Sequence, residues 1–185
     1  MGQYYTPVII KDKEIKTYRC YDFDNGAKLM EHSYIGNTFA ESVVRELYHN
    51  KSRIAWVGDY ADDSDTKPNG CDPFIKAENK SEAYLKVPQK INHWENSMFI
   101  CYVNHTKKEW FIPCECVTPT EWGNFIHPLP LLTAIGNGMG GGDYHGTCME
   151  RVGSWACDEI ELTEWNDSLK QYKDISNEIK FKEGR

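Results

Sequence analysis

The residues best suited to chemistry lie in a glycine-dense segment. Between Gly136 and Gly146 the sequence reads GNGMGGGDYHG. Glycine loses more conformational freedom on folding than any other residue, so such a run predicts a backbone that needs positive φ or the close approach of another group. The amides of such a segment could bind a small anion by pointing several N–H groups at one place. The alternative is a tightly folded loop that packs against its own domain.

The same segment matches the spacing of the dinucleotide-binding fingerprint at Gly136, Gly138 and Gly141. That fingerprint works only where a helix follows it and directs its N-terminus at a pyrophosphate. Residues 143–155 contain two further glycines and no helical apolar stripe. The sequence therefore argues against a Rossmann fold, and we expect no cofactor.

Carboxylates and imidazoles suited to proton transfer occur at Glu31, His32, Asp59, Asp143 and His145. If they converged on one cleft, they would form an acid–base site of a small hydrolase or transferase. Glu31 and His32 lie in a segment with strand character, where neighbouring side chains point to opposite faces, so only one of them would face a given cleft. The competing interpretation is that each histidine makes a structural hydrogen bond. The sequence leaves open whether the protein is an enzyme.

Two short patterns contain ligands that zinc prefers: Cys114 with Cys116, and His145 with Cys148. Neither is a paired Cys-x-x-Cys knuckle. The Cys-x-Cys pair, on an expected strand, would direct both thiols to one face without completing four ligands. We predict no metal site, although the sequence leaves open whether these four residues bind an ion.

The tripeptide Gly-Asp-Tyr occurs at residues 58–60 and again at 142–144. A tryptophan lies close to each copy and could stack on a base or a sugar, although packing in the core is the commoner role of such a ring. The residues predicted to bind a ligand are Trp56, Gly58, Tyr60, Gly138, Gly140, Gly141, Gly142, Tyr144 and Trp155. This prediction depends on whether the two turns meet in the fold.

The elements that must position these residues indicate an α+β fold with a mainly antiparallel sheet. Segments rich in Val, Ile, Tyr and Thr between turn residues predict strands. The expected strands span residues 4–10, 16–23, 28–34, 53–57, 98–103, 109–113, 129–135 and 151–162, and residues 177–182 are expected to form a polar edge strand or a tail. The first two of these strands are expected to form one hairpin, and those at 98–103 and 109–113 a second. Residues 61–73 read as an exposed loop, and 74–94 as mostly irregular.

One principal amphipathic helix is expected over residues 38–50, packed on a face of the sheet. Thr38 and Glu41 have the spacing of a capping box. The apolar positions recur at helical spacing and form one stripe. They are Phe39, Val43, Val44, Leu47 and Tyr48.

Length and composition limit the function classes. The 185 residues, 40% of them hydrophobic, suffice for a single domain with its own core. The net charge of −7 argues against direct binding to nucleic acid, which depends on basic side chains that displace counterions. Seven cysteines without regular spacing predict reduced thiols and a cytoplasmic location. No apolar run reaches the ~18 residues of a membrane span, so we expect no membrane partner.

Four stretches carry a resemblance to other proteins. They are GQYY at 2–5, KLMEHSY at 28–34, WVGDYA at 56–61 and HPLPLLTAIGNGMGGGDY at 127–144. Together they resemble a family of small proteins of Firmicutes and their phages. The resemblance brings no fold, activity or cofactor, and implies only a mobile-element setting in which a counter-defence role is expected by analogy.

The leading hypothesis is a non-enzymatic binding domain that recognises a small anionic ligand or a host protein through the glycine-rich loop. Two alternatives remain. One is the acid–base hydrolase or transferase described above. The other is an acidic inhibitor that mimics nucleic acid and arrays its carboxylates along one exposed face.

Overall fold

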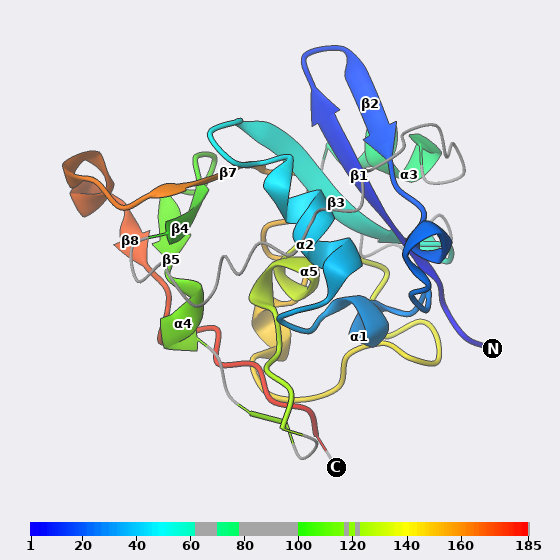
Figure 1. Ribbon diagram of the computed structural model, residues 1–185. Helices are drawn as coiled ribbons and strands as arrows, with labels where there is room; N and C mark the ends of the chain where they lie inside the picture. The colour runs from blue at the N-terminus through cyan, green and yellow to red at the C-terminus, as the bar shows by residue number, and fades with distance from the viewer. Residues whose placement is uncertain (62–69, 78–99, 117–118, 121–122, 185) are drawn as a thin grey trace.

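A single eight-stranded sheet organises the chain in the computed structural model, which describes residues 1–61, 70–77, 100–116, 119–120 and 123–184 (Figure 1). The strand order is β2-β1-β3-β7-β4-β5-β8, with β6 beside β3. The strands are β1 (Tyr5–Lys11), β2 (Glu14–Thr17), β3 (Ser52–Gly58), β4 (Ile100–Asn104), β5 (Glu109–Phe111), β6 (Ala134–Ile135), β7 (Glu159–Glu164) and β8 (Lys173–Asp174). All pairs are antiparallel except β3 with β6 and β5 with β8. The predicted α+β fold with a mainly antiparallel sheet is confirmed.

The N-terminal hairpin forms one edge of the sheet and projects from the molecule at the top of Figure 1. A two-residue turn joins β1 to β2, and Asp12 in that turn adopts a φ of +53°. Aspartate tolerates this left-handed conformation better than most residues. The second arm is shorter than predicted, because it ends at Thr17 and a 3₁₀ turn, η1 (Cys20–Phe23), follows.

Strand β3 lies at the centre of the fold, and its side chains alternate between two apolar clusters. Ile54 and Trp56 face the larger cluster, whereas Ala55 and Val57 face the smaller one. Both faces of the strand are therefore buried, which explains why it reads as an almost continuous apolar run.

Helices cover both faces of this part of the sheet. The side that contains Trp56 packs against α1 (Leu29–His32), α2 (Thr38–Arg45) and α5 (Pro128–Leu132), which lie in front of the sheet in Figure 1. The opposite side packs against α3 (Asp72–Ala77). The predicted amphipathic helix is present but shorter, because it ends at Arg45 and Tyr48 already bridges to Leu162. Its cap is Asn37, whose side chain accepts a hydrogen bond from the amide of Ala40, so the prediction that Thr38 caps it is wrong.

One of the other predicted strands is wrong, and two are borne out only in part. Residues 28–34 contain α1, because the Glu31 carboxylate accepts a hydrogen bond from the amide of Lys28 and so closes a helical turn. Residues 129–135 are divided between α5 and β6, since two prolines in the first turn favour the helix. Strand β7 begins only at Glu159, after the 3₁₀ turn η3 (Met149–Arg151).

Near the C-terminus, β8 follows the 3₁₀ turn η4 (Asp167–Gln171), and residues 177–182 form no strand. Of the two alternatives predicted for these residues, a polar edge strand or a tail, the strand is therefore wrong. Ile179 and Phe181 are instead buried in the larger apolar cluster.

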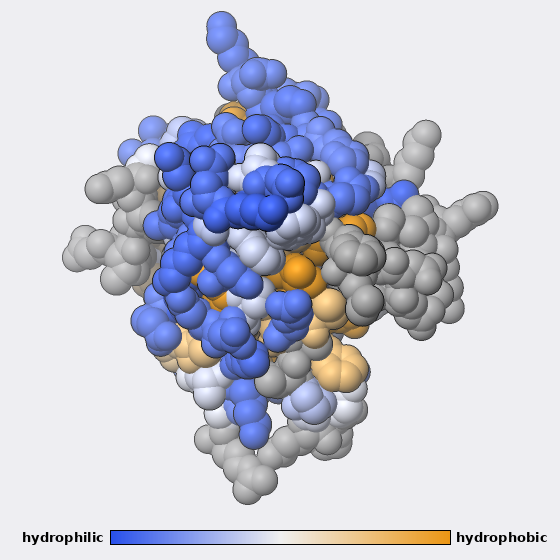
Figure 2. All heavy atoms as spheres, turned by 90° about the vertical axis from the view of Figure 1, so that its left-hand side faces the viewer, coloured by the Kyte–Doolittle hydropathy of each residue, from blue (hydrophilic) through white to orange (hydrophobic). Residues whose placement is uncertain are grey.

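The predicted hairpin of β4 and β5 is confirmed. One of its faces packs Tyr102 and Phe111 into the main core, and the other face contributes Cys101 and Val103 to a small third cluster. Figure 2 looks onto the side of the molecule that carries these strands and shows a hydrophobic area in the middle of a mostly hydrophilic surface. The predicted Cys-x-Cys strand after β5 is wrong, because residues 113–116 form the helical turn α4 (Pro113–Cys116).

A disulfide joins Cys71 to Cys157, 86 residues apart in sequence. Both sulfurs lie in the smaller apolar cluster, beside α3. The prediction that all thiols are reduced is therefore wrong for this pair. Oxidising compartments favour such bonds, and the predicted cytoplasmic location stays a prediction.

Candidate functional site

The glycine-rich loop lies against the N-terminal segment of the chain. Gly141 donates a hydrogen bond from its amide to the carbonyl of Met1 at 3.0 Å, and its own carbonyl accepts one from the amide of Gln3 at 3.1 Å. In Figure 1 the yellow loop and the blue N-terminal segment lie side by side. The loop therefore continues the sheet-like pairing beyond the start of β1.

Asp143 holds the loop from the inside. One of its carboxylate oxygens accepts hydrogen bonds from the amides of Gly138 at 2.7 Å and Gly140 at 2.9 Å. The other accepts one from the hydroxyl of Tyr5 at 3.0 Å. Asp143 is only 5% exposed. The nest of amides that the sequence predicts for an external anion thus binds a carboxylate of the chain itself.

Tyr5 is held in its protonated form at this site. Burial, followed by the neighbouring Asp143 carboxylate, raises the pKa of the Tyr5 hydroxyl well above its usual range. The phenol therefore acts as a permanent hydrogen-bond donor to Asp143, and it links the loop to β1.

Gln3 occupies the space that the glycines leave open. A Cβ added at Gly58 would lie 1.9 Å from Gln3 Nε2, and one at Gly136 would lie 2.5 Å from the same atom. A Cβ at Gly140 would lie 2.4 Å from the Cβ of Gln3 and 2.8 Å from its backbone nitrogen. Real Cβ atoms do not approach other atoms so closely, so a side chain at Gly58 or Gly136 would force the Gln3 side chain to move, and Gly140, which faces the Gln3 backbone, requires glycine. We call this arrangement of Gly58, Gly136 and Gly140 around Gln3 the glycine cradle.

The amide of Gln3 is unsatisfied inside the glycine cradle. The residue is fully buried, and neither Nε2 nor Oε1 has a hydrogen-bond partner among the described residues. A buried polar group without a partner is destabilising and is rare in folded proteins. It marks the glycine cradle as an unusual place in the fold.

The two Gly-Asp-Tyr turns meet at the N-terminal segment. The amide of Tyr4 donates to the Asp59 carboxylate at 3.1 Å, and the amide of Asp59 donates to the carbonyl of Tyr4 at 2.9 Å. Tyr5, the next residue, pairs with Gly58 and bonds to Asp143. Residues 3–5 therefore lie between the first turn and the second.

The five predicted acid–base residues serve separate contacts. His32 is fully buried, accepts a hydrogen bond from Trp56 Nε1 at its Nδ1, and lies 2.9 Å from the carbonyl oxygen of Gly26 through its Nε2. Burial lowers the pKa of His32 to about 4, so the ring is neutral near pH 7. Among the described residues, no hydrogen bond or ion pair joins any two of the five. The other four residues make different contacts. Glu31 closes α1, and Asp59 accepts a hydrogen bond from the amide of Tyr4. Asp143 holds the glycine-rich loop, and the carbonyl of the exposed His145 accepts a hydrogen bond from the amide of Gly184.

The predicted stacking rings lie in the core. Trp56 and Trp155 are both fully buried, and their indole nitrogens donate to His32 and Glu109. Tyr144 is also fully buried, and its hydroxyl lies within hydrogen-bond distance of the carbonyl oxygens of Thr147 at 2.8 Å and Lys182 at 2.9 Å. These three rings present no face to a ligand in this structure, whereas Tyr60 is half-buried beside Asp59.

The exposed residues around the glycine cradle are largely apolar. Met1 is fully exposed, Tyr4 is 51% exposed and Met139 is 38% exposed. Each belongs to the backbone that the loop and the N-terminal segment hold together, and the exposed carboxylate of Asp59 lies beside Tyr4. We call Met1, Tyr4, Asp59 and Met139 the N-terminal patch.

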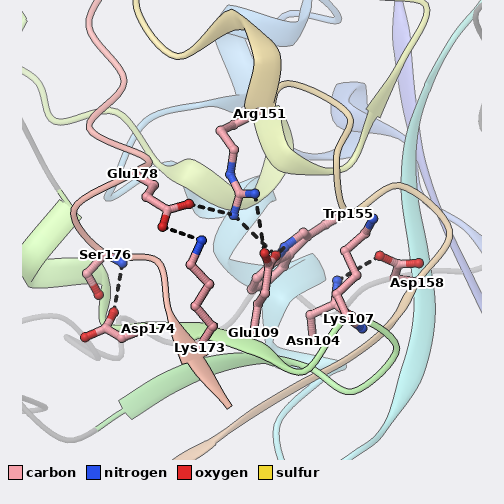
Figure 3. Close-up of polar contacts among 10 residues, drawn as sticks. All are labelled: Asn104, Lys107, Glu109, Arg151, Trp155, Asp158, Lys173, Asp174, Ser176 and Glu178. Atoms are coloured by element: carbon pink, nitrogen blue, oxygen red, sulfur yellow. Dashed lines mark hydrogen bonds and ion pairs between the residues drawn. The ribbon is translucent and has the colours of Figure 1, made fainter.

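Sequence reasoning missed a second polar cluster, which Figure 3 shows. Glu109 accepts hydrogen bonds from both terminal nitrogens of Arg151, at 3.4 and 3.2 Å, and from Trp155 Nε1 at 2.7 Å. Arg151 also lies 4.0 Å from Glu178, which pairs with Lys173 at 2.5 Å. Two acidic and two basic groups balance in charge. The cluster therefore ties β5, η3 and the C-terminal segment together, and only the tertiary structure could reveal it.

The candidate metal ligands do not assemble into a site in the part of the chain that the structure describes, where no group of three or more His, Cys, Asp or Glu side chains could hold an ion. Cys114 is exposed on α4, whereas Cys116 is buried. Burial raises the pKa of the Cys116 thiol to about 12, which disfavours the thiolate that zinc binds.

Comparisons with known proteins give no match. No family model matches the chain, no curated protein matches it, and no solved structure matches it. Among the described residues, no helix is both long enough and apolar enough to cross a bilayer.

Proposed function

We propose that this chain is a non-enzymatic binding domain that recognises another protein through the N-terminal patch. The observation that carries the proposal is the rigid support beneath exposed apolar side chains. Asp143 and Gln3 hold the backbone from below, so Tyr4 and Met139 project from positions that are already ordered. Exposed aromatic and methionine side chains on a fixed backbone are typical anchors of protein interfaces, because little conformational entropy is lost on binding.

The use of the loop amides favours a protein partner over a small anion. Gly138 and Gly140 already donate to Asp143, and Gly141 already donates to Met1. A phosphate or carboxylate ligand would have to displace these bonds. A protein partner would need only the exposed side chains, and the net charge of −7 favours one with a basic surface.

The setting of the proposed interaction comes from the sequence resemblance alone. A host protein that acts against phages or mobile elements is the partner class that this resemblance suggests. The acid–base alternative receives no support from the contacts of the described residues, because no hydrogen bond or ion pair joins any two of its five members.

The test is a comparison of variants in partner capture. The wild-type chain and the double variant Tyr4→Glu/Met139→Glu would be immobilised and exposed to host lysate, and the bound proteins would be identified by mass spectrometry. Two controls place the same change on exposed apolar side chains outside the N-terminal patch, Phe125→Glu and Met149→Glu. We expect a partner that binds the wild type and both controls but not the double variant.

A partner retained by the double variant, or lost equally from the controls, would contradict the proposal. A nucleotide panel monitored by thermal shift provides the other arm, since a ligand that binds the native state raises Tm. We expect no shift, and a clear one would restore the small anionic ligand.

A further inference from the structure

A hollow lies at the opposite edge of the sheet from β8, near the turn of the N-terminal hairpin. It opens to solvent, and its enclosed part has room for about one water-sized group. Ile9 and Ser52 form part of its lining, and polar side chains complete it. Lys11, Lys16, Glu14, Glu46 and Asn50 are these side chains.

The strand register explains why these side chains meet. Ile9 and Lys11 are two residues apart on β1 and so point to the same face. Ile9 pairs with Lys16 on β2, which adds that lysine to the same face. On the other side of β1, Ile10 pairs with Arg53, so Ser52 lies next to Lys11. Two ammonium groups and a hydroxyl are therefore brought to one face by three neighbouring strands.

The hydroxyl of Ser52 is unpaired in the part of the chain that the structure describes. The residue is 2% exposed, and its Oγ has no hydrogen-bond partner among the described residues. Leaving a buried hydroxyl unpaired is unfavourable, because it has lost water and gained nothing in exchange. An atom that fills the hollow beside it would restore that hydrogen bond.

The two ammonium groups are only partly engaged. Lys11 donates to the side-chain oxygen of Asn50, which is neutral. Lys16 Nζ lies 3.4 Å from Glu46 and 3.9 Å from Glu14, both longer than the roughly 2.7–2.9 Å of a strong charge-assisted hydrogen bond. Each ammonium has three donors, so both retain hydrogen-bonding capacity toward the hollow.

We propose that this hollow binds a small oxyanion, of the phosphate or carboxylate class, through Lys11, Lys16 and Ser52. One oxygen accepts from the Ser52 hydroxyl and the others face the two ammonium groups. The anion competes with Glu46 for Lys16, and the long contact between those two residues makes that exchange inexpensive. Glu14 opposes it less, because its side chain is 68% exposed and solvent screens its charge. The site is independent of the N-terminal patch.

The test is an NMR titration of the whole chain with sodium phosphate, and in parallel with sodium acetate, against sodium chloride at matched ionic strength. We expect saturable shifts of the amides of Lys11, Lys16 and Ser52. Lys16→Met and Ser52→Ala should each weaken binding about tenfold or more, the effect of losing one charge-assisted hydrogen bond. Saturation by acetate as well as phosphate would identify a carboxylate as sufficient, whereas phosphate alone would require the larger oxyanion.

Lys13→Met is the matched control, because Lys13 is exposed in the same hairpin but does not line the hollow. Thermal unfolding of each variant checks that it is folded. The absence of a saturable shift with either anion would overturn the proposal, and leave the hollow to solvent. Equal weakening by Lys13→Met and Lys16→Met would also overturn it, because that result indicates diffuse attraction rather than a site.

Discussion

Replacement of Gln3 by methionine is expected to stabilise the protein, although it changes a fully buried side chain at the centre of the candidate site. Both polar atoms of the buried Gln3 amide lack a hydrogen-bond partner within the described ranges of the chain, and three glycines surround the side chain. Methionine has a similar length, no polar hydrogen and a flexible shape that fills irregular spaces. The substitution Gln3→Met therefore removes an unfavourable group without opening a large cavity.

The magnitude follows from the cost of an unsatisfied buried group, about 1–3 kcal/mol. A gain of ~2 kcal/mol would raise Tm by roughly 4–8 °C in a chain of this size. The backbone hydrogen bond from Gln3 to Gly141 stays in place, since it does not involve the side chain. Gln3→Ala should instead destabilise, because it removes the packing together with the amide.

Urea unfolding followed by tryptophan fluorescence would measure the free energy of unfolding, with an unchanged m-value as the sign that the native and denatured states are comparable. A lower free energy of unfolding for Gln3→Met than for the wild type would contradict the claim that the buried Gln3 amide is destabilising. The amide would then be making favourable contacts, for example with a buried water molecule.

Three further predictions follow from named contacts. Gly140→Ala should lower the free energy of unfolding by about 1–3 kcal/mol, because the added Cβ would lie 2.8 Å from the backbone nitrogen of Gln3. Gly141→Ala is the control: no atom lies closer than 3.6 Å to its added Cβ, so its free energy of unfolding should stay within about 0.5 kcal/mol of the wild type in the same assay. Reduction of the Cys71–Cys157 disulfide should lower the free energy of unfolding by roughly 4–5 kcal/mol, from the 86-residue separation that it closes, and identical urea curves with and without reductant would contradict this. The buried, neutral His32 should make stability depend on pH: its contribution is complete above its unfolded pKa of about 6.5 and is lost as pH falls toward its folded pKa of about 4, a loss of up to about 3 kcal/mol. Measured from pH 7 to pH 4, His32→Asn should show a smaller fall than the wild type, and parallel curves would exclude His32 as a cause.

Features that depend on neighbouring residues could be predicted from the amino-acid sequence. The hairpins of β1 with β2 and of β4 with β5 follow from alternating apolar residues around short polar turns. The amphipathic stripe of α2 and the buried run of β3 were also predictable, because each pattern has the period of its own element. The need for glycine around residue 140 was also visible, because the glycines are consecutive or nearly so in the sequence.

The groups that pack against the glycines, Asp143 and Gln3, could be identified only from the tertiary structure. Asp143 bonds Tyr5 across 138 positions in the sequence, and no local pattern indicates that a carboxylate of the loop itself would take its amides. The fit of Gln3 into the glycine cradle is equally non-local.

Short segments were decided in the same way. Residues 28–34 have strand-like composition, yet the contact of Glu31 with the amide of Lys28 and the burial of His32 against Trp56 make them helical. A few residues carry too little intrinsic preference to resist such contacts. Long periodic elements can therefore be predicted from the local sequence, whereas the candidate site is formed by packing between segments that are far apart along the chain.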